Sequence, residues 1–172
     1  MVRASVSVDG DRALLEARRV LKSGGVLAAQ EPAKDADLCG GPFSEAAQRF
    51  NRLVVDDWRL ARGDPFLGRR LKALAYDAGF VDVATGAVFE WADAKSNEAL
   101  TTFGRARLHE ATFRDRVVGL EIVDAPILDW LAESFDARMA ERAAFYAGAE
   151  VQILARKPRY PRMSADQGNF DV

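Results

Sequence analysis

Three side chains of this sequence have the chemistry, and a position, from which a reactive site could be built. Glu31 follows the apolar run 26–29 and could orient a substrate or accept a proton from a nucleophile. His109 is the single histidine, and its ordinary pKa near neutrality suits a general base. Cys39 is the single cysteine and lies beside glycines in a predicted loop, where its thiolate would be a nucleophile.

Each of these residues also has a structural interpretation, which the surrounding sequence favours. Glu31 fits a solvated loop carboxylate, and His109 has no paired nucleophile and no carboxylate placed to orient it. Nothing near Cys39 in the sequence would depress the pKa of its thiol. One histidine, one cysteine and no carboxylates at ligand spacing predict that there is no metal site. The catalytic residue therefore stays unidentified.

Substrate contacts are easier to nominate than a catalytic group. Ligands of open α/β sheets bind outside the carboxyl ends of the strands, and Gln30 and Glu31 directly follow a predicted strand. Tryptophans fit core packing, with an apolar pocket wall as the alternative; the sequence has Trp58, Trp91 and Trp130. We name Gln30, Glu31 and Trp58 as candidate substrate-binding residues.

Composition limits the partners and the surroundings of the chain. Its 172 residues are 49% hydrophobic, which suits one domain with a core. A formal net charge of −2, with basic and acidic residues interleaved, argues against a nucleic-acid partner. The sequence has no signal-peptide core and no apolar run near the roughly 20 residues of a membrane span. Together with the lone cysteine, these features predict a cytoplasmic protein with no membrane partner.

Hydrophobic periodicity predicts an alternation of helices and strands. The segment 19–25 reads as a helix end, a glycine stop at Gly24 or Gly25, and the start of a strand covered on both faces. Asp9 to Asp11 offer an N-cap for the first helix, and Asp64 with Pro65 offers a start for a later one. The predicted elements are strand 2–8, helix 11–22, strand 26–29, loop 31–41, helix 43–62, helix 65–78, strand 80–91 with a break at Gly86, helices 97–118 and 127–141, and strand 151–155.

The segment 14–25, with its Arg-Val-Leu-Lys-Ser-Gly-Gly ending, closely resembles the part of class I S-adenosylmethionine-dependent methyltransferases that precedes their fifth strand. There the motif is commonly Arg-Val-Leu-Lys-Pro-Gly-Gly, so Ser23 replaces a proline. The segments 68–71 and 78–83 resemble the family's helix and turn before its sixth strand. Trp130, Asp136-Ala137 and the closing segment 155–158 resemble its C-terminal region, particularly in small-molecule enzymes of the ubiquinone-biosynthesis type.

This resemblance implies an α/β fold that is part of a Rossmann-like methyltransferase sheet. Its strands would be the fourth to the seventh of the family, with the last strand antiparallel between its neighbours. Helices would cover both faces, and the helices between residues 97 and 141 would form a lid or cap over the substrate. Residues 1–158 would be the C-terminal part of a methyltransferase-like domain, and 159–172 a loose polar tail.

The resemblance also implies S-adenosylmethionine as cofactor, with Arg3, Ala4 and Ser5 near it at a strand end. The family holds its cofactor over a glycine-rich turn after its first strand, and the likeness here begins near the fourth strand. Gly24-Gly25 cannot replace that turn, because it follows a helix and opens a strand, whereas a nucleoside-cradling turn does the reverse.

The function implied is methyl transfer to a small organic molecule, with this chain supplying mainly the substrate side. Two alternatives stay open. One is a non-catalytic truncated chain or a subunit completed by a partner or a second copy through the strand edge near Val2, because uncovered edges invite pairing. The other is an independent small-molecule-binding α/β domain.

Overall fold

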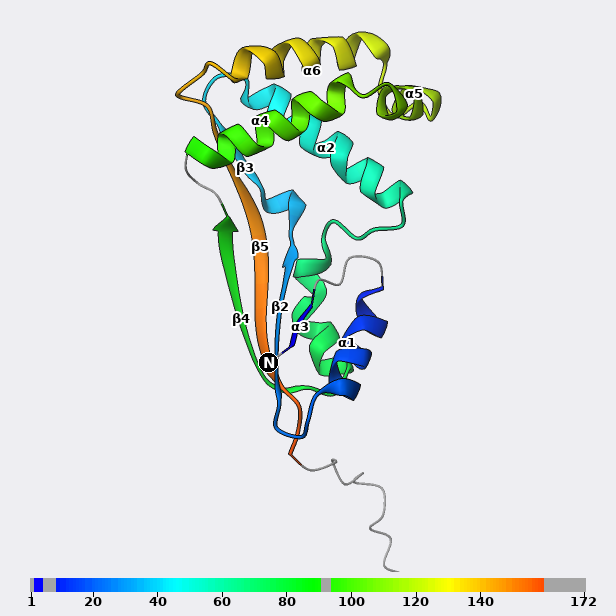
Figure 1. Cartoon of the computed structure of the whole chain (residues 1–172), viewed down its shortest axis with the longest axis vertical. Helices are drawn as coiled ribbons and strands as arrows, with labels where there is room; N and C mark the ends of the chain where they lie inside the picture. Colours follow the sequence, from blue (N-terminus) through cyan, green and yellow to red (C-terminus); the bar gives the residue numbers. More distant parts are fainter. Residues whose placement is uncertain (1, 5–8, 91–93, 160–172) are drawn as a thin grey trace, which may run out of the picture.

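A computed structural model describes residues 2–4, 9–90 and 94–159, in which a twisted sheet carries helices along one side and a helical layer at one end (Figure 1). None of the described helices is long and apolar enough to cross a membrane. The elements are β1 (Val2–Ala4), α1 (Gly10–Val20), β2 (Val26–Pro32), the 3₁₀ helix η1 (Lys34–Ala36), β3 (Leu38–Gly40), α2 (Ser44–Leu60), α3 (Leu67–Asp77), β4 (Val81–Glu90), α4 (Ala94–His109), α5 (Ala111–Gly119), α6 (Ala125–Arg138) and β5 (Phe145–Arg156).

The long final strand β5 organises the sheet. It is antiparallel to β2 on one side and to β4 on the other, while β1 is parallel to β2. The register pairs Ala29 with Ile153 and Gln30 with Gln152. The first residues of β5 also pair with the short strand β3. The chain is therefore α/β, as the sequence predicts, and its last strand lies inside the sheet.

One face of the sheet is covered by α1 and α3, which lie side by side in Figure 1. Both helices are amphipathic and turn their apolar residues to the strands, as their helical spacing predicts. Together they bury a core, here called the sheet core, of leucines, alanines and few larger side chains: Leu14, Ala17, Leu21, Leu27, Ala29, Leu67, Leu71, Leu74, Ala75, Ala78, Phe80, Val83, Ile153 and Ala155.

The opposite face of the sheet corrects the expectation that helices cover both faces. Side chains alternate along a strand, so Ala28 and Leu154 point away from the sheet core. Leu154 is 53% exposed, and its partner across the ladder, Ala84, is exposed too. No described helix runs along the middle of this face. Strand β2 is therefore covered by the described helices on one face only, although its apolar run 26–29 predicts burial on both faces.

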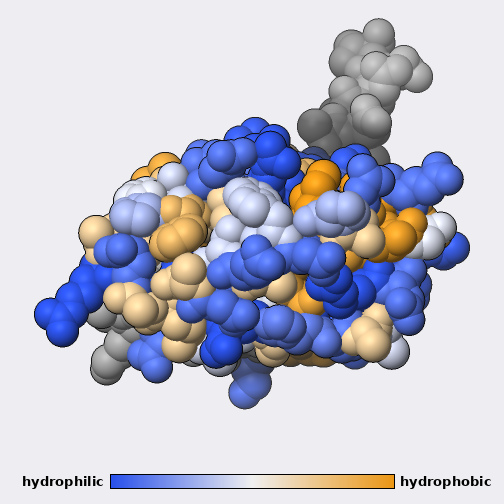
Figure 2. All heavy atoms as spheres, turned by 90° about the horizontal axis from the view of Figure 1, so that it is seen from above, coloured by the Kyte–Doolittle hydropathy of each residue, from blue (hydrophilic) through white to orange (hydrophobic). Residues whose placement is uncertain are grey.

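The helices α2, α4, α5 and α6 form a cap at the end of the sheet that carries the carboxyl end of β2 (Figure 1). They enclose a second core, the cap core, around Phe50, Phe113, Phe135 and the first residues of β5. Figure 2 looks down on this cap and shows hydrophobic residues gathered on the side where α5 lies, where Val118 and Leu120 are exposed. The expected helical cap is present, with α2 as a further member.

Several local expectations meet the structure in detail. Asp9 caps α1, with its carboxylate accepting from the Arg12 backbone N–H at 3.2 Å, and Gly24 rather than Gly25 takes the positive φ after the helix. The break expected at Gly86 is absent, because pairing with β5 continues through it, and the irregularity falls between Val81 and Ala84. Two further features were not predicted: η1 and β3 inside the expected loop 31–41, and the division of 97–118 into α4 and α5 at Glu110.

Candidate functional site

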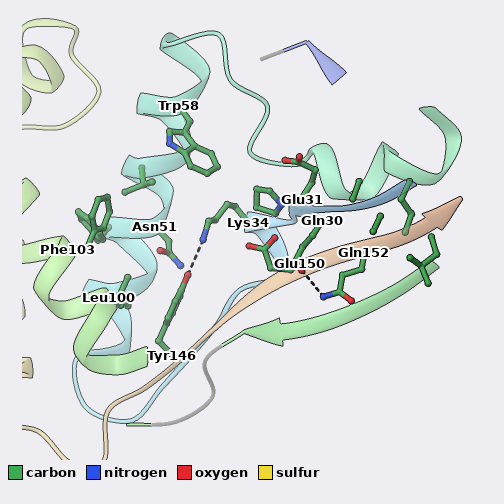
Figure 3. A pocket seen from close by; sticks show the side chains of 17 residues that line it. Gln30, Glu31, Lys34, Asn51, Trp58, Leu100, Phe103, Tyr146, Glu150 and Gln152 are labelled. Carbon is green, nitrogen blue, oxygen red and sulfur yellow. Dashed lines mark hydrogen bonds between the residues drawn. The ribbon is translucent and has the colours of Figure 1, made fainter. Parts of the chain in front are cut away.

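A cavity lies where the cap meets the sheet, at the carboxyl end of β2 (Figure 3). Its volume is about 920 Å³, which is within the range of small-molecule sites. It is open to solvent and draws its lining from β2, η1, β5, α2 and α4. Among the described residues this is the place where an open α/β sheet is expected to bind a ligand.

The cap supplies the apolar wall of the pocket. Successive turns of α2 present Phe50, Val54 and Trp58, and α4 adds Leu100 and Phe103. The ring of Phe50 is fully buried and meets Phe103 edge to face, with centroids 5.9 Å apart. Phe103 and Trp58 are 49% and 39% exposed, so part of each ring is available to a ligand. Flat apolar rings of this kind suit a small organic molecule.

The sheet supplies a polar floor. The Gln152 side-chain amide donates to the Gln30 side-chain oxygen at 2.8 Å, across paired positions of β5 and β2. Glu150 lies two residues from Gln152 on the same face, and Figure 3 shows it beside the pocket. Strand alternation sends Glu31 to the other side, toward α3, where it is 1% exposed. Glu31 is therefore a buried carboxylate at the pocket edge and not the solvated one that the sequence favours.

A carboxylate just outside the pocket holds three of its lining side chains. The oxygen Oδ2 of Asp37 accepts from Lys34 Nζ at 3.1 Å, from Tyr146 OH at 2.7 Å and from Asn51 Nδ2 at 3.3 Å. Its Oδ1 accepts from the Ala149 backbone N–H at 2.8 Å. Lys34 Nζ also donates to Tyr146 OH at 3.1 Å, the dashed contact near Asn51 in Figure 3. Three chain segments are thereby fixed around one buried acceptor.

Tyr146 is kept in its protonated form by this arrangement. Burial, followed by the adjacent Asp37 charge, raises the pKa of the Tyr146 phenol well above its ordinary value. The phenol therefore donates to Asp37 throughout the physiological range. Tyr146 is not a proton acceptor at neutral pH, and its ring instead closes one side of the pocket.

The candidate substrate residues from the sequence come together in this pocket. Gln30, Glu31 and Trp58 all line it, although each belongs to a different surface of it. Trp58 thus faces the pocket instead of packing the core, and Trp130 is 38% exposed with the Arg49 guanidinium 5.4 Å from its ring centre. Trp91 lies outside the described residues.

The candidate cofactor residues are placed by their backbone alone. Arg3 and Ala4 belong to β1 and pair with Ala28 and Ala29, two alanines that line the pocket. Ser5 lies outside the described residues. Strand β1 therefore runs beside the pocket at its carboxyl end.

Sequence reasoning missed Lys34, Asp37, Asn51 and Tyr146. Lys34 and Asp37 lie in a segment expected to be loop, and Asn51 lies within the predicted helix 43–62. Tyr146 falls between the predicted helix 127–141 and strand 151–155, whereas the structure places it in β5. One signal was available, since Lys34 and Asp37 are three residues apart and can pair within a single turn. Asn51 and Tyr146 reach Asp37 from segments that are distant in the sequence, so no local pattern indicates these two contacts.

The remaining reactive candidates lie elsewhere. His109 is exposed, and its Nε2 lies 3.5 Å from Asp136 Oδ2 on the cap surface, a carboxylate that the sequence did not reveal as a partner. Burial raises the pKa of the Cys39 thiol, which disfavours a nucleophilic thiolate. Within the part of the chain that the structure describes, no cluster of histidine, cysteine or carboxylate groups could hold a metal ion.

Two of the described glycine turns lack the form of a nucleoside cradle. Gly24 and Gly25 lie at the amino end of β2, away from the pocket, and pack against the chain after β5. The turn between β3 and α2 has the required order of strand, glycine and helix. A Cβ at its Gly41 would nevertheless lie 2.0 Å from the Ala143 carbonyl oxygen, so the protein itself fills that space. These residues do not form a cradle for S-adenosylmethionine.

Comparisons with known proteins give partial likenesses. No family model matches the chain. Over 72 residues it is 42% identical to an uncharacterized 37.1 kDa protein in transposon TN4556 of Streptomyces fradiae, a match that covers 42% of this chain and 20% of that protein. The chain thus spans about a fifth of the length of this curated relative.

Among solved structures, the chain is similar to phosphoethanolamine N-methyltransferase 2 of Haemonchus contortus in complex with phosphomonomethylethanolamine and S-adenosylhomocysteine. That likeness has a TM-score of 0.38 and 16% identity, and covers 88% of this chain and 30% of the other. A structure described as a putative sarcosine dimethylglycine methyltransferase from Galdieria sulphuraria gives the same TM-score and identity, with 91% and 51% covered.

Proposed function

We propose that this chain supplies the substrate-binding side of an S-adenosylmethionine-dependent methyltransferase that acts on a small organic molecule. The observation that carries the proposal is the pocket at the carboxyl end of β2, walled by α2 and α4. Its combination of aromatic rings on one side and paired amides on the other suits a compact ligand with one polar end. The order of elements within residues 1–158 resembles the second half of that family's domain.

The chain's own residues perform binding, orientation and exclusion of water in this proposal. Trp58 and Phe103 cover the apolar part of the substrate, while Gln30, Gln152 and Lys34 offer hydrogen bonds to its polar part. Holding a nucleophile in one orientation is the main catalytic contribution available to such a site. Cofactor contacts from Arg3, Ala4 and Ser5 are part of the proposal, and the principal cofactor cradle is assigned to residues other than the described glycine turns.

Benzyl alcohol, detected by saturation-transfer NMR, tests the pocket as a small-molecule site. We expect it to bind the wild-type chain and to lose binding in Val54→Trp, because the larger ring fills the space between α2 and the sheet. Leu60→Trp on the exposed end of the same helix is the matched control and should bind like wild type. Equal binding by all three proteins would overturn the assignment of this pocket.

Calorimetric titration with S-adenosylmethionine tests the proposal that this chain provides mainly the substrate side of the site and not the principal cofactor cradle. We expect no micromolar binding by this chain alone, because the Gly24-Gly25 and Gly41 turns in the described part of the chain lack the form of a nucleoside cradle. Micromolar binding would contradict the proposal that the chain provides mainly the substrate side.

A second candidate function, a subunit completed by a partner chain or a second copy, is favoured by the edge of the sheet. Among the described strands, β1 pairs with β2 alone, so its other edge has no partner in the part of the chain that the structure describes. The exposed Leu154 lies on β5 of the same sheet, with β2 between it and β1. Unpaired edges and apolar faces of this kind favour association.

Sedimentation equilibrium separates the two candidates. A dimer that dissociates when Val2 is replaced by proline would support pairing through β1, because proline removes a ladder donor. A monomer at all concentrations, with unchanged melting temperature, would contradict it.

A further inference from the structure

The charges around the pocket are unevenly distributed. Among the described lining residues the charged side chains are Glu31, Lys34 and Glu150, so Lys34 is the one cation of that set. Its side chain is 19% exposed and its Nζ lies at the pocket wall (Figure 3). By itself the Lys34 ammonium would attract a carboxylate or phosphate ligand, whereas Glu31 and Glu150 in the same lining would oppose one.

The buried carboxylate of Asp37 changes that expectation. Asp37 is 2% exposed at its side chain, lies behind the wall rather than in it, and is 3.1 Å from Lys34 Nζ. All four of its contacts are donors: an ammonium, a phenol, a side-chain amide and a backbone N–H. Such a set is what an ionised carboxylate accepts, and it leaves the Lys34 charge locally balanced.

We propose that Asp37 sets the charge selectivity of the pocket, so that it takes an uncharged small molecule and rejects an anionic one. The inference rests on the proposed function of the pocket as a substrate site. Within the described part of the chain, Lys34 uses two of its three donors, toward Asp37 and Tyr146, and the third N–H can bind a hydroxyl or carbonyl oxygen of the ligand. An anion in the same place would lie near the Asp37 carboxylate, which solvent hardly screens.

Three probes with one ring and different charges test this selectivity near neutral pH: benzyl alcohol, benzoate and benzylamine. We expect wild-type chain to bind benzyl alcohol more tightly than benzoate. In Asp37→Asn the ratio of benzoate to benzyl alcohol affinity should rise by at least about tenfold, because the Lys34 charge is then unbalanced. Ligand-detected NMR titration gives the ratio directly, even for weak binders.

A second variant moves the selectivity in the opposite direction. Lys34→Met leaves Asp37 without its ammonium, so the ratio of benzylamine to benzyl alcohol affinity should rise by about tenfold. The matched control is Asp35→Asn, which removes a carboxylate of the same short helix that pairs with Arg69 outside the pocket. This control should keep the wild-type ratios.

The outcomes separate the inference from the function on which it rests. Absence of probe binding to wild type, or binding that Val54→Trp leaves unchanged, overturns the pocket assignment and the inference with it. Binding in the pocket with ratios unchanged in both Asp37→Asn and Lys34→Met overturns the inference alone. If Asp37→Asn does not fold, Lys34→Met decides, because a merely structural role of the network would lower stability without moving a selectivity ratio.

Discussion

The sheet core and the cap core differ in the side chains that fill them and in how they position the pocket. The sheet core is mostly leucine and alanine, with Phe80 as its largest member, beneath a hydrogen-bonded ladder. The cap core is built around Phe50, Phe113 and Phe135. Floor residues such as Gln30 are therefore fixed by strand register, whereas wall residues depend on the packing of aromatic rings between helices.

The pocket should be more sensitive to a loss of packing in the cap core than to one in the sheet core. Phe50 is both a member of the cap core and a lining residue, and the Phe135 ring packs against it at a tilt of 60°, with centroids 4.9 Å apart. Among the described residues, Ala29 and Ile153 belong to the sheet core and also line the pocket. Both side chains are smaller than that of Phe50. A loss of packing should therefore reach the ligand more directly through the cap.

The largest expected effect tests that asymmetry with a pair of core substitutions. Phe135→Ala and Phe80→Ala both remove a fully buried ring, and each should lower the free energy of unfolding by about 3–5 kcal/mol. Only Phe135→Ala should also weaken benzyl alcohol binding, because Phe50 loses its support. Chemical denaturation and NMR titration check the two parts, and equal losses of binding in both variants would remove the distinction between the cores.

A smaller effect is expected where α3 approaches the floor. A Cβ at Gly68 would lie 2.6 Å from the Glu31 carbonyl oxygen and 2.8 Å from that of Pro32. Because backbone cannot yield as a flexible side chain does, Gly68→Ala should cost about 1–3 kcal/mol and displace the end of β2. Gly86→Ala is the control, since its Cβ would meet nothing within 4 Å. Similar urea midpoints for the two variants would contradict the close approach.

A pH effect is expected from Tyr146, which joins the two regions through β5. Its raised pKa means that the folded state favours the protonated phenol, so its contribution to stability is complete below the ordinary tyrosine value near 10 and is lost above it. The free energy of unfolding should fall there by at most about 1.4 kcal/mol per pH unit. In Tyr146→Phe, the free energy of unfolding should lose the part of its decrease with pH that comes from Tyr146. The control Tyr76→Phe changes an exposed tyrosine and should show the same decrease as wild type.

The smallest effect is expected from the N-cap residue of α1, Asp9, which does not line the pocket. Asp9→Ala removes the side-chain acceptor of the Arg12 N–H and should cost about 1 kcal/mol. Because α1 belongs to the sheet core, binding of benzyl alcohol should be unchanged. A change in affinity as large as that of Phe135→Ala would show that the two regions are coupled more tightly than their contacts suggest.

Much of the element order was predictable because its signals are local. The N-cap at Asp9, the glycine stop before β2 and the amphipathic spacing of α1 and α3 each depend on residues within a few positions. The prediction that helices cover both faces of the sheet was wrong for the described residues. An apolar run such as 26–29 has the same sequence pattern whether one face of the strand or both faces are buried. The candidate substrate residues Gln30, Glu31 and Trp58 line one pocket, whereas Asp37 and its partners were not predicted.

Residue type and short-range spacing were enough to predict the α/β alternation, the N-cap of α1 at Asp9 and the glycine stop before β2. The contacts of Asn51 and Tyr146 with Asp37, and of Gln30 with Gln152, were decided by the tertiary structure. These contacts join segments that are far apart in the chain. Their existence depends on strand register and helix packing, which no local pattern encodes.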